Sequence, residues 1–391
     1  MNKPPVPLAL SQPVFNPVML PQGLQRGMIA ASAPRSDKFI ASYERNVLFY
    51  DVFWEHGGKR IILIGPPAID LAPHYRAARY VAQPSGVAVK AKAHHSSTVF
   101  VFSLRPPAGT THLDIELGGA TQRVGVAQNH SDFFAGRNLL FTLSQNNDLQ
   151  WIADWARFHV VNQGVDAVLL FDNRSTRYTP ADIEATLLAV PGLQRVAVVP
   201  TPFTYPHEDR GVPKHIFWAH FLQPAVIVDM FRRYGMASNG ILNCDIDELA
   251  VPLADKTVFA EATASRSGTV YFRGCWIEPV PEKDREGGYR HADFRQVEAD
   301  VNYGRGGTNK WALTPNRPWL QKLRIHPYPH SVANRPPLSR HKPGTAYIAH
   351  FKAISTGWKY DRGVVDAAAA PIREDAPLSA ALDRAFGSDR G

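Results

Sequence analysis

The chain has 391 residues, 45% hydrophobic and 20% charged, a composition typical of a folded globular protein with room for two domains. Its net charge is +8, but the Lys and Arg residues are scattered, which argues against a basic tail for nucleic acid. The two cysteines exclude a disulfide framework and favour a reducing, cytoplasmic location. Because no stretch of about 18 consecutive apolar residues occurs, any membrane association is expected to be peripheral.

The first third of the chain carries the pattern of short β-strands. Residues 1–40 are punctuated by proline and serine and are expected to be irregular. Residues 46–54 (NVLFYDVFW) and 59–65 (KRIILIG) are aromatic and β-branched runs separated by the turn signal Gly57-Gly58. Similar runs follow at 85–93, 98–104, 112–117 and 121–127. We therefore predict an all-β, sandwich-like accessory module over residues 41–132.

The pattern changes near residue 133 to alternating strands and helices. Strands are expected at 138–143, 166–171, 195–199 and 239–251, and helices at 148–162, 180–188 and 211–234. Further short strands are expected at 268–276, 309–319, 322–326 and 345–351. This alternation predicts an α/β domain over residues 133–366, built on a mostly parallel sheet flanked by helices. Residues 367–391 are expected to form an Ala-rich helical tail.

Residues 239–251 read NGILNCDIDELAV and place two carboxylates directly after an apolar run. In an extended backbone Asp245 and Asp247 point to the same side, where they repel each other unless a cation lies between them. Oxygen ligands favour Mg²⁺ or Mn²⁺, and these ions keep positions open for phosphate oxygens. The alternative is a polar turn in which one aspartate caps the next element.

Polar residues also follow two earlier strands of the predicted sheet. In open α/β sheets ligands bind beyond the carboxyl ends of the strands. We therefore expect Ser144, Asn146, Asp172 and Asn173 to contact a nucleotide, and Asp245 to lie near its diphosphate. The alternative is that these loops are simply polar. Glycine-rich dinucleotide and P-loop motifs and the G-x-S-x-G elbow are absent from the sequence, which argues against an oxidoreductase, a P-loop phosphotransferase and an α/β-hydrolase.

Three blocks in this order resemble a known family. They are Leu149-Gln150-Trp151-Ile152, Leu170-Phe171-Asp172-Asn173-Arg174-Ser175 and Asp245-Ile246-Asp247-Glu248-Leu249. Together they are similar to the family-92-type glycosyltransferases, formerly a domain of unknown function, and to their relatives in family 2. The resemblance covers roughly residues 136–355.

The resemblance implies a GT-A-type fold and transfer of a sugar from a nucleotide-sugar donor. By this likeness Asp245 and Asp247 match the metal and diphosphate motif. Asp172 and Asn173 match the end of the second strand, beside the nucleotide. The family often has an aromatic residue after the acidic triplet, where this chain has Leu249.

Four downstream residues complete the candidate site. His350 is a possible third metal ligand, and Lys352 is placed to neutralise the diphosphate leaving group. Glu278 and Asp293 are candidates for the general base that deprotonates the acceptor hydroxyl. Structural alternatives stay open for all four: a hydrogen-bonded histidine at a strand end, a solvated lysine and two surface carboxylates.

The sequence thus predicts a Mn²⁺- or Mg²⁺-dependent glycosyltransferase that moves a sugar from a UDP-sugar to a glycan or another hydroxyl acceptor. One alternative is a non-catalytic carbohydrate-binding protein with a degenerate transferase domain. Another is a nucleotidyltransferase, which would share the metal chemistry. That class calls for a glycine-rich loop with a basic residue near the first strand, and the sequence has none.

Overall fold

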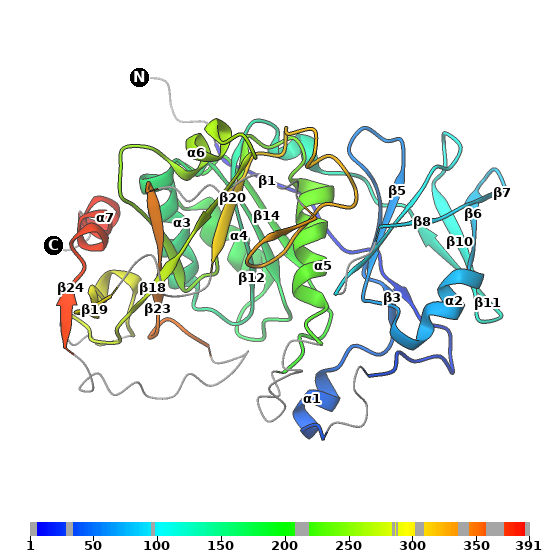
Figure 1. Cartoon of the computed structure of the whole chain (residues 1–391), viewed down its shortest axis with the longest axis horizontal. Helices are drawn as coiled ribbons and strands as arrows, with labels where there is room; N and C mark the ends of the chain where they lie inside the picture. The colour runs from blue at the N-terminus through cyan, green and yellow to red at the C-terminus, as the bar shows by residue number, and fades with distance from the viewer. Residues whose placement is uncertain are drawn as a thin grey trace.

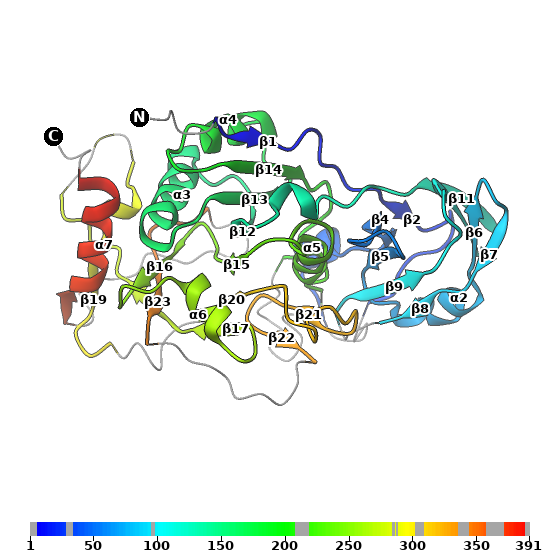
Figure 2. The ribbon, with the colours of Figure 1, turned by 90° about the horizontal axis from the view of Figure 1, so that it is seen from above.

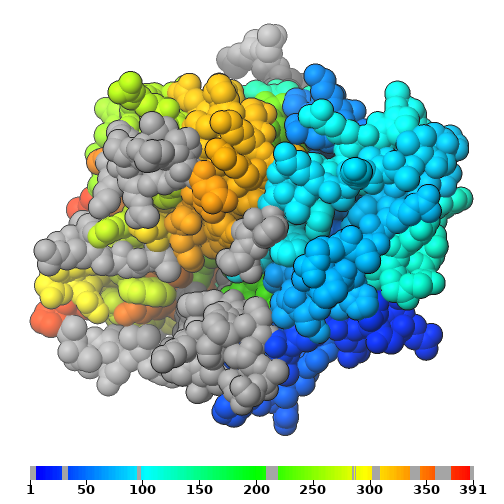
Figure 3. Space-filling model, turned by 45° about the vertical axis from the view of Figure 1, so that its right-hand side comes forward, coloured from blue at the N-terminus to red at the C-terminus, as the bar shows by residue number. Residues whose placement is uncertain are grey.

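The computed structural model describes residues 6–28, 34–94, 98–207, 219–283, 286, 288–301, 309–334, 344–356 and 371–387. An α/β body contains the middle and the C-terminal part of the chain, and a set of antiparallel sheets from the N-terminal third lies beside it (Figure 1). In the space-filling view the blue and cyan surface of this N-terminal part borders the orange segment that follows β20 (Figure 3).

The body is built on a seven-stranded sheet in the order β1-β14-β13-β12-β15-β20-β17. The first five strands of this order are parallel, and β20 runs antiparallel to both of its neighbours. The strands are β1 (Leu8–Ala9), β12 (Asn138–Ser144), β13 (Ala167–Asp172), β14 (Arg195–Pro200), β15 (Gly240–Asn243), β17 (Thr269–Phe272) and β20 (Lys310–Leu313). The mostly parallel α/β sheet predicted from the alternating pattern is confirmed.

Helices cover both faces of this sheet (Figure 2). Helices α3 (Leu149–Gln163) and α4 (Pro180–Leu188) pack on one face, and α5 (Leu222–Asp229) packs on the other. Along β12, Leu140 faces α3 while Leu139 and Phe141 face α5, as the two-residue period of a strand requires. A strand buried on both faces is apolar throughout, which is why these segments could be recognised in the sequence.

The ends of α3 and α4 are fixed by local capping. Asp148 accepts a hydrogen bond from the backbone N–H of Gln150 at the start of α3, and Gly164 ends the helix at φ 68°. Thr179 and Asp182 form a reciprocal capping box at the start of α4. Residues close in the sequence therefore determine where α3 and α4 begin and where α3 ends.

Several predicted elements differ in detail from the structure. Residues 1–40, expected to be irregular, contain β1, which joins the seven-stranded sheet, β2 (Val18–Met19) and the start of α1 (Asp37–Ser42). The helix expected over 211–234 is α5 followed by a π-helical turn, Met230–Tyr234, and residues 211–218 lie outside the described residues. Of the strand expected at 322–326, only β21 (His326–Pro327) forms, because turns occupy residues 315–324. The C-terminal tail contains β24 (Ile372–Glu374) before the helix α7 (Ala376–Phe386).

The N-terminal part contains two four-stranded antiparallel sheets. One has the order β4-β5-β9-β8 and the other β11-β10-β6-β7, and their facing side chains share one core. The strands are β4 (Asp51–Trp54), β5 (Ile61–Gly65), β6 (Arg79–Gln83), β7 (Val87–Val89), β8 (Lys92–Ala93), β9 (Phe100–Leu104), β10 (His112–Leu117) and β11 (Ala120–Gly125). The antiparallel sheets predicted here are confirmed, but the module is not all-β, because helix α2 (Ala72–Ala77) lies between β5 and β6. The domain boundaries at residues 40, 132 and 366 stay predictions.

The second face of the β4-β5-β9-β8 sheet packs against the α/β body, so it has no solvent face at β4 and β5. Ile62 and Ile64 of β5 share a core with Val226 and Met230 at the end of α5. At this contact Arg233 donates to Asp51 across 2.6 Å, and both side chains are fully buried.

A third, three-stranded sheet has the order β16-β23-β18 and adjoins the C-terminal end of β15. It consists of β16 (Glu248–Pro252), β18 (Gly274–Ile277) and β23 (Ala346–Phe351). The remaining described strands form the short pairs β2 (Val18–Met19) with β3 (Val47–Phe49), β19 (Gln296–Glu298) with β24, and β21 with β22 (Val332–Ala333). The remaining described α-helices are α1 (Asp37–Ser42), α2 (Ala72–Ala77) and α6 (Val258–Ala264). Among the described helices none is long and apolar enough to cross a membrane.

Candidate functional site

The carboxyl ends of β12 and β13 bring two predicted nucleotide contacts together. Ser144 and Asp172 are paired in the parallel register, and the backbone N–H of Asn173 donates to the carbonyl of Ser144 at 2.8 Å. Asp172 is buried, and its Oδ1 atom has no hydrogen-bond partner among the described residues. Burial raises the pKa of Asp172, although hydrogen bonds from Ser175 oppose that shift. An unpaired buried acceptor at this edge suits a donor group of a ligand.

Asn146 holds the loop after β12 against the loop after β13. It has a left-handed backbone, with φ 54°, and its N–H donates to Ser175 Oγ at 2.8 Å. Its Oδ1 atom accepts from the N–H of Thr176 at 2.8 Å. These bonds give Asn146 a positioning role, since its amide oxygen is already used within the protein.

Asn173 and Ser144 are also engaged within the protein. Asn173 Nδ2 donates to the carbonyls of Thr201 and Phe203 at 3.0 and 2.8 Å, and the side chain is 1% exposed. Ser144 Oγ accepts from Asn147 Nδ2 at 2.9 Å. Of the four residues predicted beside a nucleotide, Asp172 therefore keeps the clearest capacity to bind one.

The acidic turn 245–247 connects β15 of the large sheet to β16 of the third sheet and is organised around a buried lysine. Lys310 Nζ lies 3.0 Å from Asp245 Oδ2 and 2.9 Å from Glu248 Oε2. Lys310 and Glu248 are each 1% exposed. Glu248 Oε2 also accepts from the backbone N–H of Asp245 at 2.9 Å. Glu248 is thus the carboxylate that closes the turn.

Asp247 points instead toward the third sheet, where His350 donates from Nε2 to its Oδ2 at 3.1 Å. His350 Nδ1 lies 3.7 Å from Glu248 Oε1. The Trp276 ring stacks on the His350 ring, with centroids 4.1 Å apart and planes inclined by 25°. The structure therefore pairs Asp247 with His350 and Asp245 with Lys310, and a turn between β15 and β16 replaces the continuous strand that was expected to hold both aspartates on one side. Ring packing fixes the imidazole.

The buried residue His291 also holds the backbone of the acidic turn. His291 is fully buried, and its Nε2 donates to the carbonyl of Ile246, between the two aspartates, at 2.8 Å. Burial lowers the pKa of His291, so the neutral imidazole is the expected form at neutral pH. This contact holds the backbone of the turn without using an aspartate side chain.

The side chains of the acidic turn fit the predicted cation only in part. Within the described part of the chain, no group of three or more His, Cys, Asp or Glu side chains is arranged to hold a metal ion. Lys310 already contributes a positive charge next to Asp245 and Glu248. The carboxylates fit Mg²⁺ or Mn²⁺ only if phosphate oxygens and water provide the other ligands, which is the usual manner of Mg²⁺ binding.

The predicted catalytic carboxylates both have partners. Glu278 accepts from Lys352 Nζ at 2.6 and 2.8 Å, so these two candidates form an ion pair at the ends of β18 and β23. Asp293 Oδ2 accepts from the backbone N–H of Arg290 at 2.7 Å and caps the short helical turn 291–293. Arg290 in turn pairs with the buried Asp154 of α3.

Lys310 and His291 were missed by the sequence reasoning. The available signal for Lys310 was its position directly before the apolar run that begins at Trp311. A charged residue in a buried strand needs a partner of opposite charge. Trp311 itself is fully buried in the core.

No protein-family model matches the chain, and no curated protein matches its sequence. The resemblance to family-92-type glycosyltransferases therefore stays a prediction based on the three sequence blocks.

Proposed function

We propose that this protein is a glycosyltransferase of the GT-A type that takes a sugar from a UDP-sugar and gives it to a hydroxyl of a glycan. One observation carries the proposal. The acidic turn leaves the central parallel strand β15 at the edge of the sheet where β13 ends in the buried Asp172. This is the edge at which open α/β sheets bind nucleotides. The proposed location is cytoplasmic.

In this proposal the chain's own residues divide the work along that edge. Asp172 Oδ1, which lacks a partner among the described residues, accepts a hydrogen bond from the nucleoside. Lys352, 17% exposed, supplies a positive charge for the departing diphosphate while paired with Glu278. His350 and Trp276 form a packed surface beside Asp247. The acceptor's proton goes to a carboxylate, for which Glu278 and Asp293 are the proposed alternatives.

A divalent cation, Mn²⁺ or Mg²⁺, is part of the proposal, and Asp247 and His350, which lie 3.1 Å apart, would contribute its protein ligands while phosphate oxygens and water fill the other positions. When bound, such an ion stabilises the negative charge of the leaving diphosphate. Lys310 keeps Asp245 and Glu248 in place and reduces the repulsion between the carboxylates of the turn.

The test is a screen of nucleotide-sugar donors that measures released nucleoside diphosphate, with Mn²⁺, with Mg²⁺ and with a chelator. We expect release from a UDP-sugar, and a decrease of about 100-fold or more in the Asp247→Asn variant, since a group that stabilises developing charge contributes on this order. Asp255→Asn is the matched control, because Asp255 is exposed in the loop after β16. Equal rates in the wild type and Asp247→Asn would reject the role of the turn.

A non-catalytic carbohydrate-binding protein is the second candidate, and Lys310 is the observation that favours it. In a metal-dependent transferase a metal ion would be expected to neutralise carboxylates such as Asp245 and Glu248. Here the ammonium of Lys310 already neutralises them. Calorimetric titration with UDP and Mn²⁺ separates the two functions. Binding of UDP that depends on Mn²⁺ supports the transferase, whereas glycan binding without UDP binding supports the alternative.

A further inference from the structure

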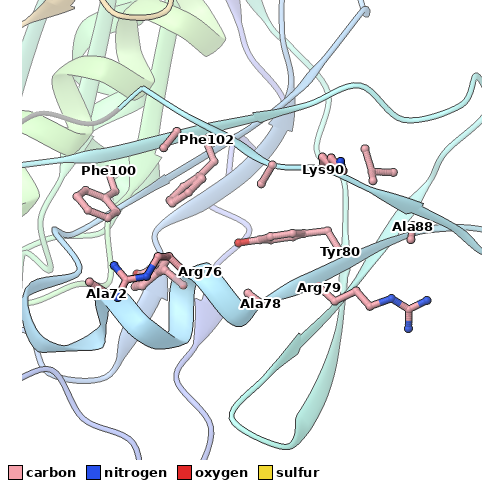
Figure 4. A pocket seen from close by; sticks show the side chains of 13 residues that line it. Ala72, Arg76, Ala78, Arg79, Tyr80, Ala88, Lys90, Phe100 and Phe102 are labelled. Carbon is pink, nitrogen blue, oxygen red and sulfur yellow. The ribbon is translucent and has the colours of Figure 1, made fainter.

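The N-terminal β sheets contain a cavity of about 820 Å³ that the proposed transfer reaction does not use. It lies between helix α2 and strands β6 to β9, and it is lined by aromatic, small apolar and basic side chains (Figure 4). Its volume is within the range of small-molecule sites, which is about 300–1,000 Å³. None of the acidic turn's residues lines it.

One wall of the cavity is a rigid aromatic cluster. The rings of Tyr75 and Phe102 are stacked, with centroids 5.7 Å apart and planes inclined by 4°. Phe100 packs against both rings, at 5.6 Å from Tyr75 and 5.8 Å from Phe102. The Tyr75 hydroxyl donates to the carbonyl of Leu48 at 2.9 Å, which fixes the ring from outside the cavity. Phe100 is partly exposed and gives the wall an accessible flat face.

Tyr80 contributes a buried polar group to the same space. Its side chain points into the cavity, with the hydroxyl between Arg76 and the rings of Phe100 and Phe102 (Figure 4). The residue is 3% exposed, and its hydroxyl has no hydrogen-bond partner among the described residues. An unpaired buried hydroxyl is destabilising, because it has lost its hydrogen bonds to water without gaining another. A ligand that hydrogen-bonds to this hydroxyl would recover that cost.

The charges around the cavity have one sign. Arg76, Arg79 and Lys90 line it and are exposed, and the lining contains no carboxylate. Arg79 pairs at its outer side with Glu116 at 3.2 Å, and in Figure 4 it extends away from the aromatic wall. Arg76 and Lys90 therefore set the positive potential at the cavity, which suits an anionic ligand.

We propose that this cavity binds an acidic oligosaccharide, with a sugar ring stacked on the aromatic wall and separate sugar carboxylates paired with Arg76 and with Lys90, which lie on opposite sides of Tyr80 (Figure 4). The apolar C–H face of a sugar matches a flat aromatic ring, and a sugar hydroxyl provides the partner that Tyr80 lacks. An acyl chain of an anionic lipid would fill the apolar space but leave the Tyr80 hydroxyl unpaired. This site is independent of the proposed transferase activity.

The experiment is calorimetric titration of the full chain with two acidic probes, a hexamer of galacturonic acid and a sulfated disaccharide repeat, and with the neutral maltohexaose. We expect at least one acidic probe to bind with a dissociation constant below about 1 mM and to bind at least tenfold tighter than the neutral one. A higher salt concentration is expected to weaken the binding of the acidic probe. Absence of binding by both acidic probes, or equal binding of maltohexaose, overturns the proposal.

Three variants assign the binding to this cavity. Arg76→Ala is expected to lower the affinity for the acidic probe about tenfold, because it removes a charged hydrogen bond. Tyr80→Phe is expected to lower it about fivefold, because it removes a neutral one. Arg105→Ala, an exposed arginine outside the lining, is the matched control and is expected to bind as the wild type. Unchanged affinity in Arg76→Ala and Tyr80→Phe overturns the assignment.

Phosphatidylglycerol vesicles test the lipid alternative. If Arg76→Ala abolishes binding to these vesicles while the wild type binds neither acidic saccharide, the cavity is a lipid site and the proposal fails. Because these are binding measurements, a failure here leaves the UDP-sugar assay unaffected, and a failure of that assay leaves this proposal standing.

Discussion

Replacing Lys310 with methionine tests whether the acidic turn depends on a buried cation. Methionine keeps an unbranched apolar chain but removes the ammonium that lies 3.0 Å from Asp245 and 2.9 Å from Glu248. Glu248, whose side chain is 1% exposed, then remains in the core without its principal positive partner. The variant therefore isolates the contribution of the charge from that of the packing.

The magnitude follows from the geometry. Two opposite charges about 3 Å apart attract by about 5 kcal/mol at an effective dielectric constant near 20. Desolvation of the lysine offsets several kcal/mol of this attraction. Removing one member of a buried pair costs about 3–5 kcal/mol, because the other charge is left uncompensated. We expect about 3 kcal/mol for Lys310→Met, at the low end, because the Asp245 side chain is 23% exposed and regains water.

The assay is urea unfolding followed by far-ultraviolet circular dichroism, which gives the free energy of unfolding of each variant. Lys256→Met is the matched control. Lys256 pairs with Glu261 at 3.0 Å but is 44% exposed, so its loss is expected to cost less than about 1 kcal/mol. The double variant Lys310→Met/Glu248→Gln should recover at least about 1 kcal/mol, because it also removes the stranded carboxylate.

A free energy of unfolding of Lys310→Met within about 1 kcal/mol of the wild type would refute this reasoning. Equal effects of the Lys310 and Lys256 substitutions would do so as well, since the argument depends on the burial of Lys310.

Two further predictions concern buried groups elsewhere. Burial lowers the pKa of His159 to about 3, and its Nε2 accepts from the N–H of Ala250. Between this pKa and the unfolded value near 6.5 the unfolded state binds more protons than the folded state, so the free energy of unfolding falls as the pH falls. From pH 7.5 to pH 5 the wild type should lose about 2 kcal/mol more than the His159→Gln variant, measured by urea unfolding. Equal losses in the two proteins would contradict this prediction. The Asp51→Asn variant removes the carboxylate that lies 2.6 Å from the buried Arg233 guanidinium, and it should lower the free energy of unfolding by about 3–5 kcal/mol in the same assay. A decrease below about 1 kcal/mol would show that this pair does not join the β sheets to the α/β body.

Much of the fold could be predicted from local sequence. The run Ala167–Asp172 is apolar until its last residue, as expected for a strand buried on both faces and ending at a polar edge. Asp148 and Gly164 mark the ends of α3 through capping that involves only near neighbours. The same locality allowed the aromatic and β-branched runs of the first third to be recognised as antiparallel strands.

The candidate site was predicted only in part, because sequence spacing gives the residue types but not their partners. His350 does lie beside Asp247, whereas Asp245 is paired with Lys310, a residue that the spacing did not point to. Asn146 and Asn173, in contrast, were expected beside a nucleotide, and the structure uses their side chains to join loops. An amide that serves a ligand and an amide that serves a loop carry the same sequence signal.

By itself, the sequence determined the alternation of strands and helices, the β-rich character of the first third and the presence of two carboxylates after an apolar strand. Only the tertiary structure decided what neutralises those carboxylates. Lys310 lies on β20, which inserts antiparallel between β15 and β17, and this strand order brings its ammonium to Asp245 and Glu248. A buried charge requires a partner, but which residue provides it depends on how distant strands are ordered in the sheet.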